Sequence, residues 1–336
     1  MVEDPNHSGL LFQEDISSSI PRNTERLWRK GAQEVGYLIK EAIVVSYNDP
    51  EGLRQLIDPL LSSPFERIVV AYGSSESDDY SFVDEVTDAR LIMIREKGRR
   101  GKIAAINSCL EFLHGDIIYL ISSDIQFDPS AVMEMEQYFS SEVGVVLPDV
   151  IPVERSGLVS RTGALLWQIR NASLRNIVEE GGTPHGGEMI AFRRGLISKM
   201  PDVVNDEEYI CMLAASEGMK VIYAENVKIN NLTAGNVRDY IRQRIRIIYG
   251  HRQMQSLGFQ PQMMDFLLLS DPMLFFKNIY AAIRKRTDLG AYLLPLLTLE
   301  AISLLGSYRY GRRENVLMWS FAKSTKPSRD WKRYRD

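Results

Sequence analysis

The sequence of 336 residues contains only two cysteines and four histidines. They show no zinc-site spacing, and no Ser-His-Asp order typical of a serine hydrolase is present. Cys109 and Cys211 fall in apolar helical patterns, which predicts buried thiols and favours a reducing compartment. The N-terminus lacks the basic and then apolar pattern of a signal peptide, so we expect residues 1–39 to form a loose leader.

Phosphate-binding loops and nucleic-acid motifs are also missing. Lys102 follows Gly101, but the earlier glycine and the following Ser or Thr of a P-loop are not there. The net charge of −4 is uneven, because residues 235–336 hold 18 Lys and Arg against 8 Asp and Glu. That part carries +10 and the preceding 234 residues carry −14. The basic part predicts an anionic partner, and we favour a membrane surface over nucleic acid.

What the sequence does have is a regular alternation of short apolar runs with amphipathic helical patterns. The expected strands are residues 42–47, 67–72, 91–94, 117–121, 144–148 and 220–224. The expected helices are residues 50–61, 103–113, 131–139, 163–180, 206–217 and 237–255. Apolar strands between helices predict an α/β fold with a mainly parallel sheet, buried on both faces. Ligands bind at the carboxyl ends of such strands, so Asn48 and Asp124 are expected at one rim.

Asp124 follows an apolar strand, directly after Ser122 and Ser123. One carboxylate in this position suits Mg²⁺ or Mn²⁺ when a substrate diphosphate and water supply the remaining ligands. A helix cap or a solvated loop residue explains this stretch equally well, so the motif alone leaves both interpretations open.

A run of acids opens the helix expected from residue 206. Asp206, Glu207 and Glu208 stabilise the positive end of the helix dipole, with Asn205 as a cap, and this is the commoner reason for such a run. The alternative is that one carboxylate faces a cleft and acts as a general base.

The basic helix over residues 237–255 has a mixed face. Gln243 and Arg246 are three residues apart and share one side, while Ile241, Ile245 and Ile248 predict that the helix is half-buried. Arginines on a packed helix near a cleft suit the binding of a diphosphate.

The order of these motifs resembles the family 2 inverting glycosyltransferases, which have the GT-A nucleotide-sugar fold. The ordered set is Tyr-Asn after one strand, Gly-Ser-Ser after the next, Gly-Lys with a later Asn, Asp124, Ala-Phe-Arg-Arg, paired acids and Gln-x-x-Arg. Within the family the chain most resembles the membrane-associated synthases of hyaluronan, chitin and cellulose. The resemblance implies a GT-A catalytic domain over residues 40–255, followed by a helical, basic region over residues 256–336.

The resemblance also implies an activity: inverting transfer of a sugar from a nucleotide-sugar, with UDP expected, to a hydroxyl or phosphate acceptor. The acceptor would be a glycan or a polyprenyl-phosphate type of lipid. Asp124 would hold Mg²⁺ or Mn²⁺, and Glu207 would be the base with Asp206 as its alternative. The residues expected at the donor are Tyr47, Asn48, Tyr72, Lys102, Asn107, Ser123, Gln243 and Arg246. Those expected at the acceptor cleft are Glu188, Phe192 and Arg193.

Some positions depart from the family pattern. Ser122 replaces the first acid of Asp-x-Asp, Tyr72 stands where acids usually read the nucleobase, the base is Glu instead of Asp, and Ile247 replaces a Trp. These departures support an alternative, a non-catalytic GT-A-like partner that binds nucleotide or glycan and recruits a synthase. A sugar-1-phosphate nucleotidyltransferase is disfavoured, because the first strand is not followed by a Gly-rich basic loop.

Residues 289–308 form an apolar stretch of membrane-span length, interrupted by Pro295 and Glu300. A buried core helix or a dimer interface explains it as well as membrane contact does. The tail over residues 318–336 mixes Trp and Tyr with Lys and Arg, as interfacial segments do. We expect a peripheral or monotopic protein at the cytoplasmic face of the membrane.

Overall fold

The computed structural model describes residues 37–74, 80–259, 267–268, 270–311, 324 and 326. The chain divides into two compact units, Met1–Tyr37 and Leu38–Asp336, and all elements named below belong to the second. The expected leader over residues 1–39 and the interfacial tail over residues 318–336 lie almost entirely outside the described residues.

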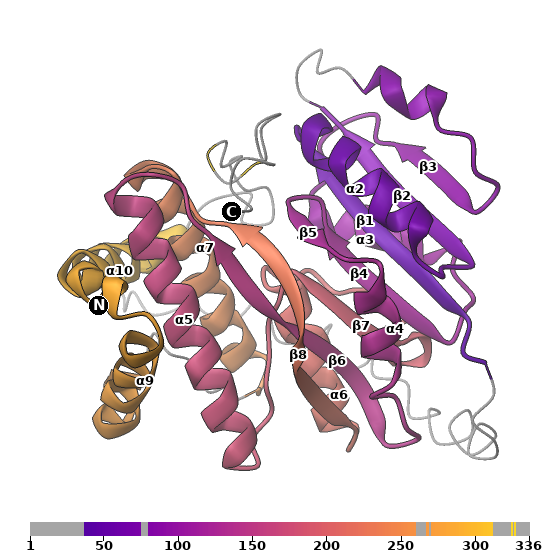
Figure 1. Ribbon diagram of the computed structural model, residues 1–336. Helices are drawn as coiled ribbons and strands as arrows, with labels where there is room; N and C mark the ends of the chain where they lie inside the picture. The colour runs from indigo at the N-terminus through magenta and orange to yellow at the C-terminus, as the bar shows by residue number, and fades with distance from the viewer. Residues whose placement is uncertain are drawn as a thin grey trace, which may run out of the picture. The chain divides into compact units, whose positions relative to one another are not determined.

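A sheet of eight strands forms the centre of this unit (Figure 1). Its spatial order is β3 (Leu91–Arg95), β2 (Arg67–Gly73), β1 (Lys40–Tyr47), β4 (Ile117–Ser122), β7 (Met189–Arg193), β6 (Val143–Val153), β8 (Lys220–Leu232) and β5 (Ile125–Phe127). Strands β1 to β4 are parallel, as are β6 and β8, whereas β7 is antiparallel to both its neighbours and β5 is antiparallel to β8. The prediction of an α/β fold with a mainly parallel sheet is confirmed, although β5 and β7 were not predicted.

Helices cover both faces of the sheet, which explains the continuous apolar runs. In β1, Ala42 and Val44 face one core while Ile43 faces the other, because successive side chains point to opposite sides. One face is covered by α2 (Pro50–Ser62) and α4 (Ser130–Glu136), the other by α3 (Lys102–Leu110) and α6 (Asp206–Ser216). Short 3₁₀ segments lie at Ser81–Glu85, Arg194–Leu196 and Thr287–Tyr292. Cys109 and Cys211 are buried free thiols, as predicted.

Four longer helices build a third core beside the sheet. They are α5 (Leu158–Glu179), α7 (Val237–Ser256), α9 (Pro272–Lys285) and α10 (Leu293–Tyr310). The single carboxylate of α10, Glu300, pairs with Arg244 of α7 at 2.7 Å and accepts a hydrogen bond from Tyr240 at 2.7 Å. This pairing removes the cost of one charge in an apolar helix and fixes α10 against α7.

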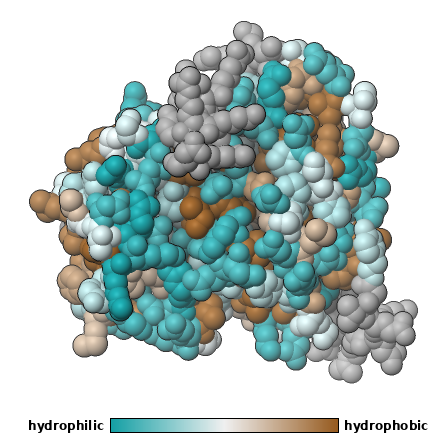
Figure 2. Space-filling view, in the orientation of Figure 1, coloured by the Kyte–Doolittle hydropathy of each residue, from teal (hydrophilic) through white to brown (hydrophobic). Residues whose placement is uncertain are grey.

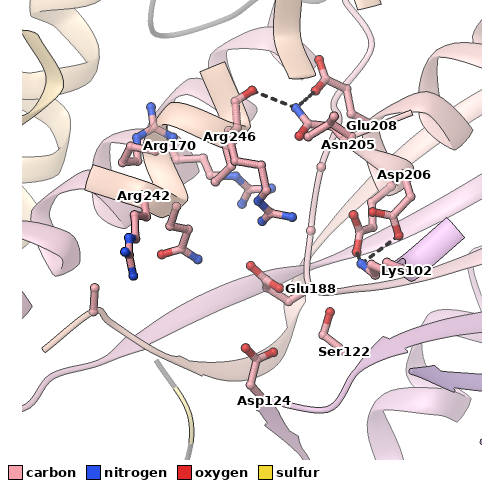
Figure 3. A pocket seen from close by; sticks show the side chains of 18 of the residues that line it. Lys102, Ser122, Asp124, Arg170, Glu188, Asn205, Asp206, Glu208, Arg242 and Arg246 are labelled. Atoms are coloured by element: carbon pink, nitrogen blue, oxygen red, sulfur yellow. Dashed lines mark hydrogen bonds and ion pairs between the residues drawn. The ribbon is translucent and has the colours of Figure 1, made fainter. Parts of the chain in front are cut away.

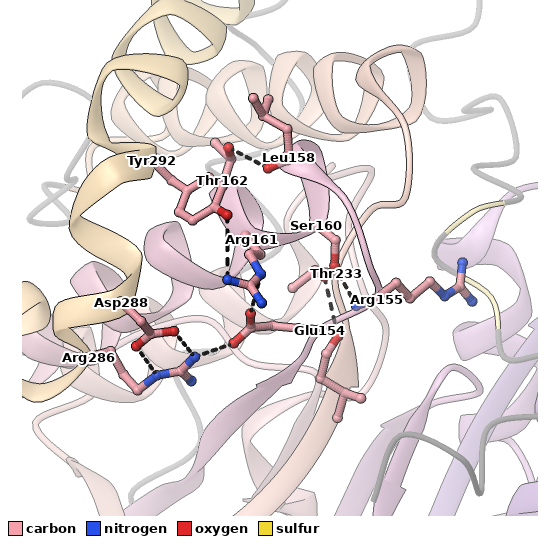
Figure 4. A network of polar contacts seen from close by, with 11 residues as sticks. Glu154, Arg155, Leu158, Ser160, Arg161, Thr162, Thr233, Arg286, Asp288 and Tyr292 are labelled. Atoms are coloured by element: carbon pink, nitrogen blue, oxygen red, sulfur yellow. Dashed lines mark hydrogen bonds and ion pairs between the residues drawn. The ribbon is translucent and has the colours of Figure 1, made fainter. Parts of the chain in front are cut away.

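A polar network ties the connection after β6 to α5, β8 and the segment before α10 (Figure 4). Arg286 Nη2 lies 2.7 Å from Glu154 Oε1 and 2.9 Å from Asp288 Oδ2, and the hydroxyls of Ser160 and Thr233 are 2.6 Å apart. Within the described part of the chain, one helical stretch, Thr287–Tyr310, is long and apolar enough to cross a membrane.

Candidate active site

A cavity of about 360 Å³ opens at the rim where β1 and β4 end. Its walls come from these strand ends, the start of β7, the N-termini of α3 and α6, and one side each of α5 and α7 (Figure 3). The predicted site residues that line it are Tyr47, Lys102, Ser123, Asp124, Glu188, Asp206, Glu207, Gln243 and Arg246. The fold therefore brings together most of the residues that the sequence singled out.

The strand rim supplies Asp124 and Glu188 (Figure 3). Parallel pairing sets Val45 of β1 opposite Ser122 of β4, so residues after both strands meet at one edge. On the other side of β4, the Ser122 amide donates to the carbonyl of Glu188 at 2.9 Å. Glu188 thus stands next to the position where the family pattern has an additional acid. Burial, followed by the nearby charge of Asp124, raises the pKa of Glu188 to about 7.

The acids at the start of α6 share a cation from α3. Lys102 Nζ lies 2.8 Å from Asp206 Oδ2 and 2.7 Å from Glu207 Oε1. Burial and then repulsion by Asp206 raise the pKa of Glu207 to about 8, while Lys102 opposes this rise. A carboxylate with a pKa near neutrality suits a general base, because it both loses and accepts a proton near working pH.

Asn205 is the N-cap residue of α6, as predicted, but its side chain makes no capping hydrogen bond to the helix backbone. Its amide donates instead to Glu208 Oε2 at 2.8 Å and to the carbonyl of Ile247 at 3.1 Å, which joins α6 to α7. A Cβ at Gly250 of α7 would lie only 2.3 Å from the Asn205 side chain. The two helices therefore approach closely because position 250 is glycine.

The opposite wall of the cavity is rich in guanidinium groups. Arg242 and Arg246 come from α7 and Arg170 comes from α5 (Figure 3). Burial lowers the pKa of Arg170 and of Arg246, and nearby carboxylates oppose this effect. Arg170 lies 4.9 Å over the Trp167 ring, and its Nη1 has no hydrogen-bond partner among the described residues. Such a wall suits an anionic ligand.

Sequence reasoning missed Arg170, Trp167 and His185, all of which line the cavity. The spacing Trp167-x-x-Arg170 puts both side chains on one side of α5, so a polar and aromatic stripe was visible in the sequence. His185 lies in the Gly-rich stretch of residues 181–187 and was not predicted as a site residue. Burial lowers its pKa and favours the neutral ring.

Two residues expected at the donor do not line the cavity. Tyr72 is buried and packs against Tyr80 with ring centres 5.2 Å apart, so it is part of the core on the α2 face. Asn48 has a φ of 54°, and its amide donates to the carbonyl of Gly73 at 3.0 Å, so its backbone forms the turn after β1. Tyr72 was expected at the donor because of its place at a strand end, but its ring is part of the hydrophobic core.

Three further residues expected at the donor or acceptor also do not line the cavity. Asn107 exchanges two hydrogen bonds with the backbone of Met200, at 2.9 and 2.7 Å. Phe192 is buried in the core beneath β7. Arg193 donates to the Val143 carbonyl at 2.8 Å and so supports the sheet edge. All three stabilise the fold and none lines the cavity.

Asp124 was predicted to hold a divalent metal. The side chains around it determine whether the protein alone could coordinate such an ion. The described residues contain no group of three or more His, Cys, Asp or Glu side chains that could hold a metal ion. Asp124 Oδ2 already accepts a hydrogen bond from Lys326 Nζ at 2.9 Å. These residues fit Mg²⁺ or Mn²⁺ that arrives with a substrate diphosphate, since the diphosphate and water then supply the missing oxygen ligands.

Comparison with known proteins bears on this site. Residues 41–200 match the model of glycosyl transferase family 2. The structure is similar to the mannosyltransferase PcManGT from Pyrobaculum calidifontis in complex with GDP-Man and Mn²⁺, with a TM-score of 0.56 and 19% identity over 85% of this chain and 92% of that chain. It also matches S. aureus TarS 1–349, with a TM-score of 0.42 and 14% identity over 82% and 92% of the two chains. Comparison with curated proteins gave no match.

Residues 41–200, just under half of the chain, are thus similar to glycosyl transferase family 2, and the fold is GT-A-like. The matched segment runs from β1 to η2 and contains Asp124 and Glu188. The family prediction is thus confirmed over this segment. The narrower resemblance to the membrane-associated synthases receives no support from these comparisons.

Proposed function

We propose that the protein transfers a sugar from a nucleoside diphosphate sugar to an acceptor hydroxyl with inversion at the anomeric carbon. The observation that carries this proposal is the arrangement of opposite charges across one cavity. Asp206 lies at one end with Asp124 at the strand rim, and Arg242 and Arg246 face them (Figure 3). Glu207 shares Lys102 with Asp206 and so lies at the same end. A substrate with a nucleophilic hydroxyl and an anionic leaving group matches this arrangement.

In this mechanism Glu207 accepts the proton of the acceptor hydroxyl while the hydroxyl oxygen attacks the anomeric carbon. The bond from that carbon to the phosphate oxygen breaks on the opposite side, and Arg246 neutralises the departing diphosphate. Mg²⁺ or Mn²⁺ held by Asp124 would supply Lewis-acid stabilisation of the same charge when bound. Lys102, expected at the donor, lies between Asp206 and Glu207 and orients the base instead.

Glu207 is a better base than Asp206 on grounds of access. The Glu207 side chain is 12% exposed whereas that of Asp206 is 2% exposed, so Glu207 is the more accessible of the two to a substrate. A poised base also favours a hydroxyl acceptor over a phosphate acceptor, because a phosphate oxygen is already ionised at neutral pH.

The donor nucleotide is the least defined part of the proposal. The family resemblance implies UDP, whereas the similar mannosyltransferase was solved with GDP-Man. We therefore expect thermal unfolding to shift upward by several degrees with UDP or with GDP, but not with both. A ligand at ~100 times its Kd stabilises the folded state by about 2.7 kcal/mol.

Addition of Mn²⁺ should extend this thermal shift only slightly in the wild type, by no more than about a threefold gain in affinity gives, and not at all in Asp124→Ala. Asp58→Ala, an exposed substitution on α2, serves as the control and should respond like the wild type. If no nucleotide shifts the wild type, the donor site is absent. The non-catalytic partner reading, favoured by Ser122 and by the buried Tyr72, then replaces this one.

We further propose that α9 and α10 contact an anionic membrane surface. Both helices leave large apolar side chains exposed, among them Met273, Phe276, Leu294 and Leu305. Figure 2 shows hydrophobic surface at the left edge, where α10 lies in Figure 1. The last turn of α9 adds basic side chains, which favour anionic lipid headgroups.

A vesicle sedimentation assay tests this membrane proposal. The protein should bind vesicles of phosphatidylglycerol and phosphatidylcholine, and the double variant Phe276→Ser, Leu305→Ser should bind at least about tenfold less, since each buried apolar side chain contributes ~1.5–3 kcal/mol. Met133→Ser, an exposed change on α4, is the control. Loss of self-association in the double variant, without any vesicle binding by the wild type, would assign the face to a second copy instead.

A further inference from the structure

Two residues far beyond α10 in the sequence, Ser324 and Lys326, contact the body of the protein, and Lys326 lines the cavity. Four hydrogen bonds hold Ser324 and Lys326 in place. Arg155 extends away from the network of Figure 4 and donates to the carbonyls of Ser324 and, at 2.7 Å, of Lys326. The Ser324 amide donates to Asp239 Oδ2 at 2.9 Å, and the Gly235 amide donates to Ser324 Oγ at 3.1 Å. The backbone at these positions is therefore anchored to the chain around the start of α7.

The Lys326 ammonium lies between two carboxylates at the strand rim. Its Nζ is 2.9 Å from Asp124 Oδ2 and 3.3 Å from Asp49 Oδ2, and the side chain lines the cavity. Asp49 is buried, caps α2 through the Gly52 amide at 3.1 Å, and accepts a hydrogen bond from Ser123 Oγ at 2.9 Å. Burial raises the pKa of Asp49, and Lys326 opposes that rise. Two acids at one rim thus share one cation.

The Lys326 ammonium lies where the charge of a donor diphosphate would need neutralisation, provided that the diphosphate binds beside Asp124. Without a cation, the carboxylates of Asp49, Asp124 and Glu188 would repel a diphosphate that enters beside them. A lysine is a compact positive charge on a flexible stem and is a common phosphate ligand. Because its backbone is anchored, Lys326 needs only side-chain rotation to exchange a carboxylate oxygen for a phosphate oxygen.

We propose that Lys326 is a donor-binding residue whose ammonium supplies positive charge to the diphosphate at the Asp124 rim and so completes the donor site. The proposal rests on the proposed function. It follows that a divalent metal and Lys326 are alternative cations at the same carboxylate. Nucleotide affinity should therefore depend only slightly on metal in the wild type and strongly on metal when the lysine is removed.

Calorimetric titration with UDP and GDP, in EDTA and in Mn²⁺, tests this dependence. In the wild type, the Kd of the nucleotide that binds should change by less than about threefold between the two buffers. In Lys326→Met the Kd in EDTA should rise at least about tenfold, as expected for loss of one hydrogen bond to a charged group. Mn²⁺ should restore most of that loss, and Lys326→Arg should retain most of the wild-type affinity in EDTA.

Lys199→Met, an exposed change outside the cavity, is the control for a general charge effect. Unchanged affinity in Lys326→Met would overturn the proposal. Tighter binding in that variant would also overturn it and would make the tail a plug that competes with the donor. Failure of the wild type to bind either nucleotide in either buffer is a different result, because it overturns the proposed function and this proposal with it.

Discussion

Replacement of Glu207 by Gln lowers kcat by about 10²–10⁴-fold, the range expected for loss of a general base. The amide keeps the size of the side chain and can still contact Lys102, but it cannot accept the acceptor proton. Nucleotide affinity should stay within a few-fold of the wild type, because Glu207 is assigned to the acceptor end of the cavity. Steady-state kinetics and nucleotide titration on the same preparation measure both quantities.

The pH profile gives a second test of Glu207. Only the deprotonated carboxylate is an active base, and its pKa is raised to about 8, so kcat/KM should rise with pH and level off above about 8. Glu217→Gln, at the other end of the same helix and exposed, should change neither rate nor profile. A nearly normal rate in Glu207→Gln together with a large loss in Asp206→Asn would move the role of the base to Asp206.

Replacement of Arg246 by Met is expected to lower kcat/KM by about 10²–10³-fold, the effect of removing one group that stabilises transition-state charge. The guanidinium lies on the α7 wall among the charges of Asp206, Glu188 and Glu207, where little water screens its interaction with a diphosphate. Arg246→Lys should recover part of the rate, because it keeps the charge and loses the paired donors.

Arg238→Met is the matched control for Arg246, since Arg238 is exposed on the first turn of the same helix. Comparison of kcat/KM with the Kd for the free nucleoside diphosphate separates stabilisation of the leaving group from simple binding. A change in Arg246→Met confined to thermal stability, with normal kcat/KM, would show that this side chain only supports packing of α7.

The sequence was sufficient to predict site residues whose positions follow from local secondary structure. The apolar run before Asp124 had to be a buried strand, and parallel strands had to place Asp124 at a ligand-binding rim. The acids from residue 206 and the spacing of Gln243 and Arg246 were also readable, because helix geometry fixes which side chains share a side. All of these residues line the cavity.

The sequence was not sufficient where contacts between residues far apart in the chain determine the role of a side chain. Asn107 binds the backbone of Met200, and no pattern near residue 107 indicates that partner. Phe192 lies in β7, a strand of five residues that was not predicted, so its direction into the core was missed. Lys326 pairs with Asp124 across 202 residues, and its role depends wholly on the path of the chain after α10.

The close contact between Gly250 and Asn205 also bears on how this protein can be redesigned to test the proposed activity. The Asn205 side chain, at the start of α6, packs against the α7 backbone at Gly250. This contact holds α6, which carries Glu207, at a set distance from α7, which carries Arg246. The α5 wall, with Trp167 and Leu174, lies outside that contact. Libraries that alter acceptor preference are best confined to the α5 wall, whereas any larger residue at position 250 would change the distance between base and leaving group.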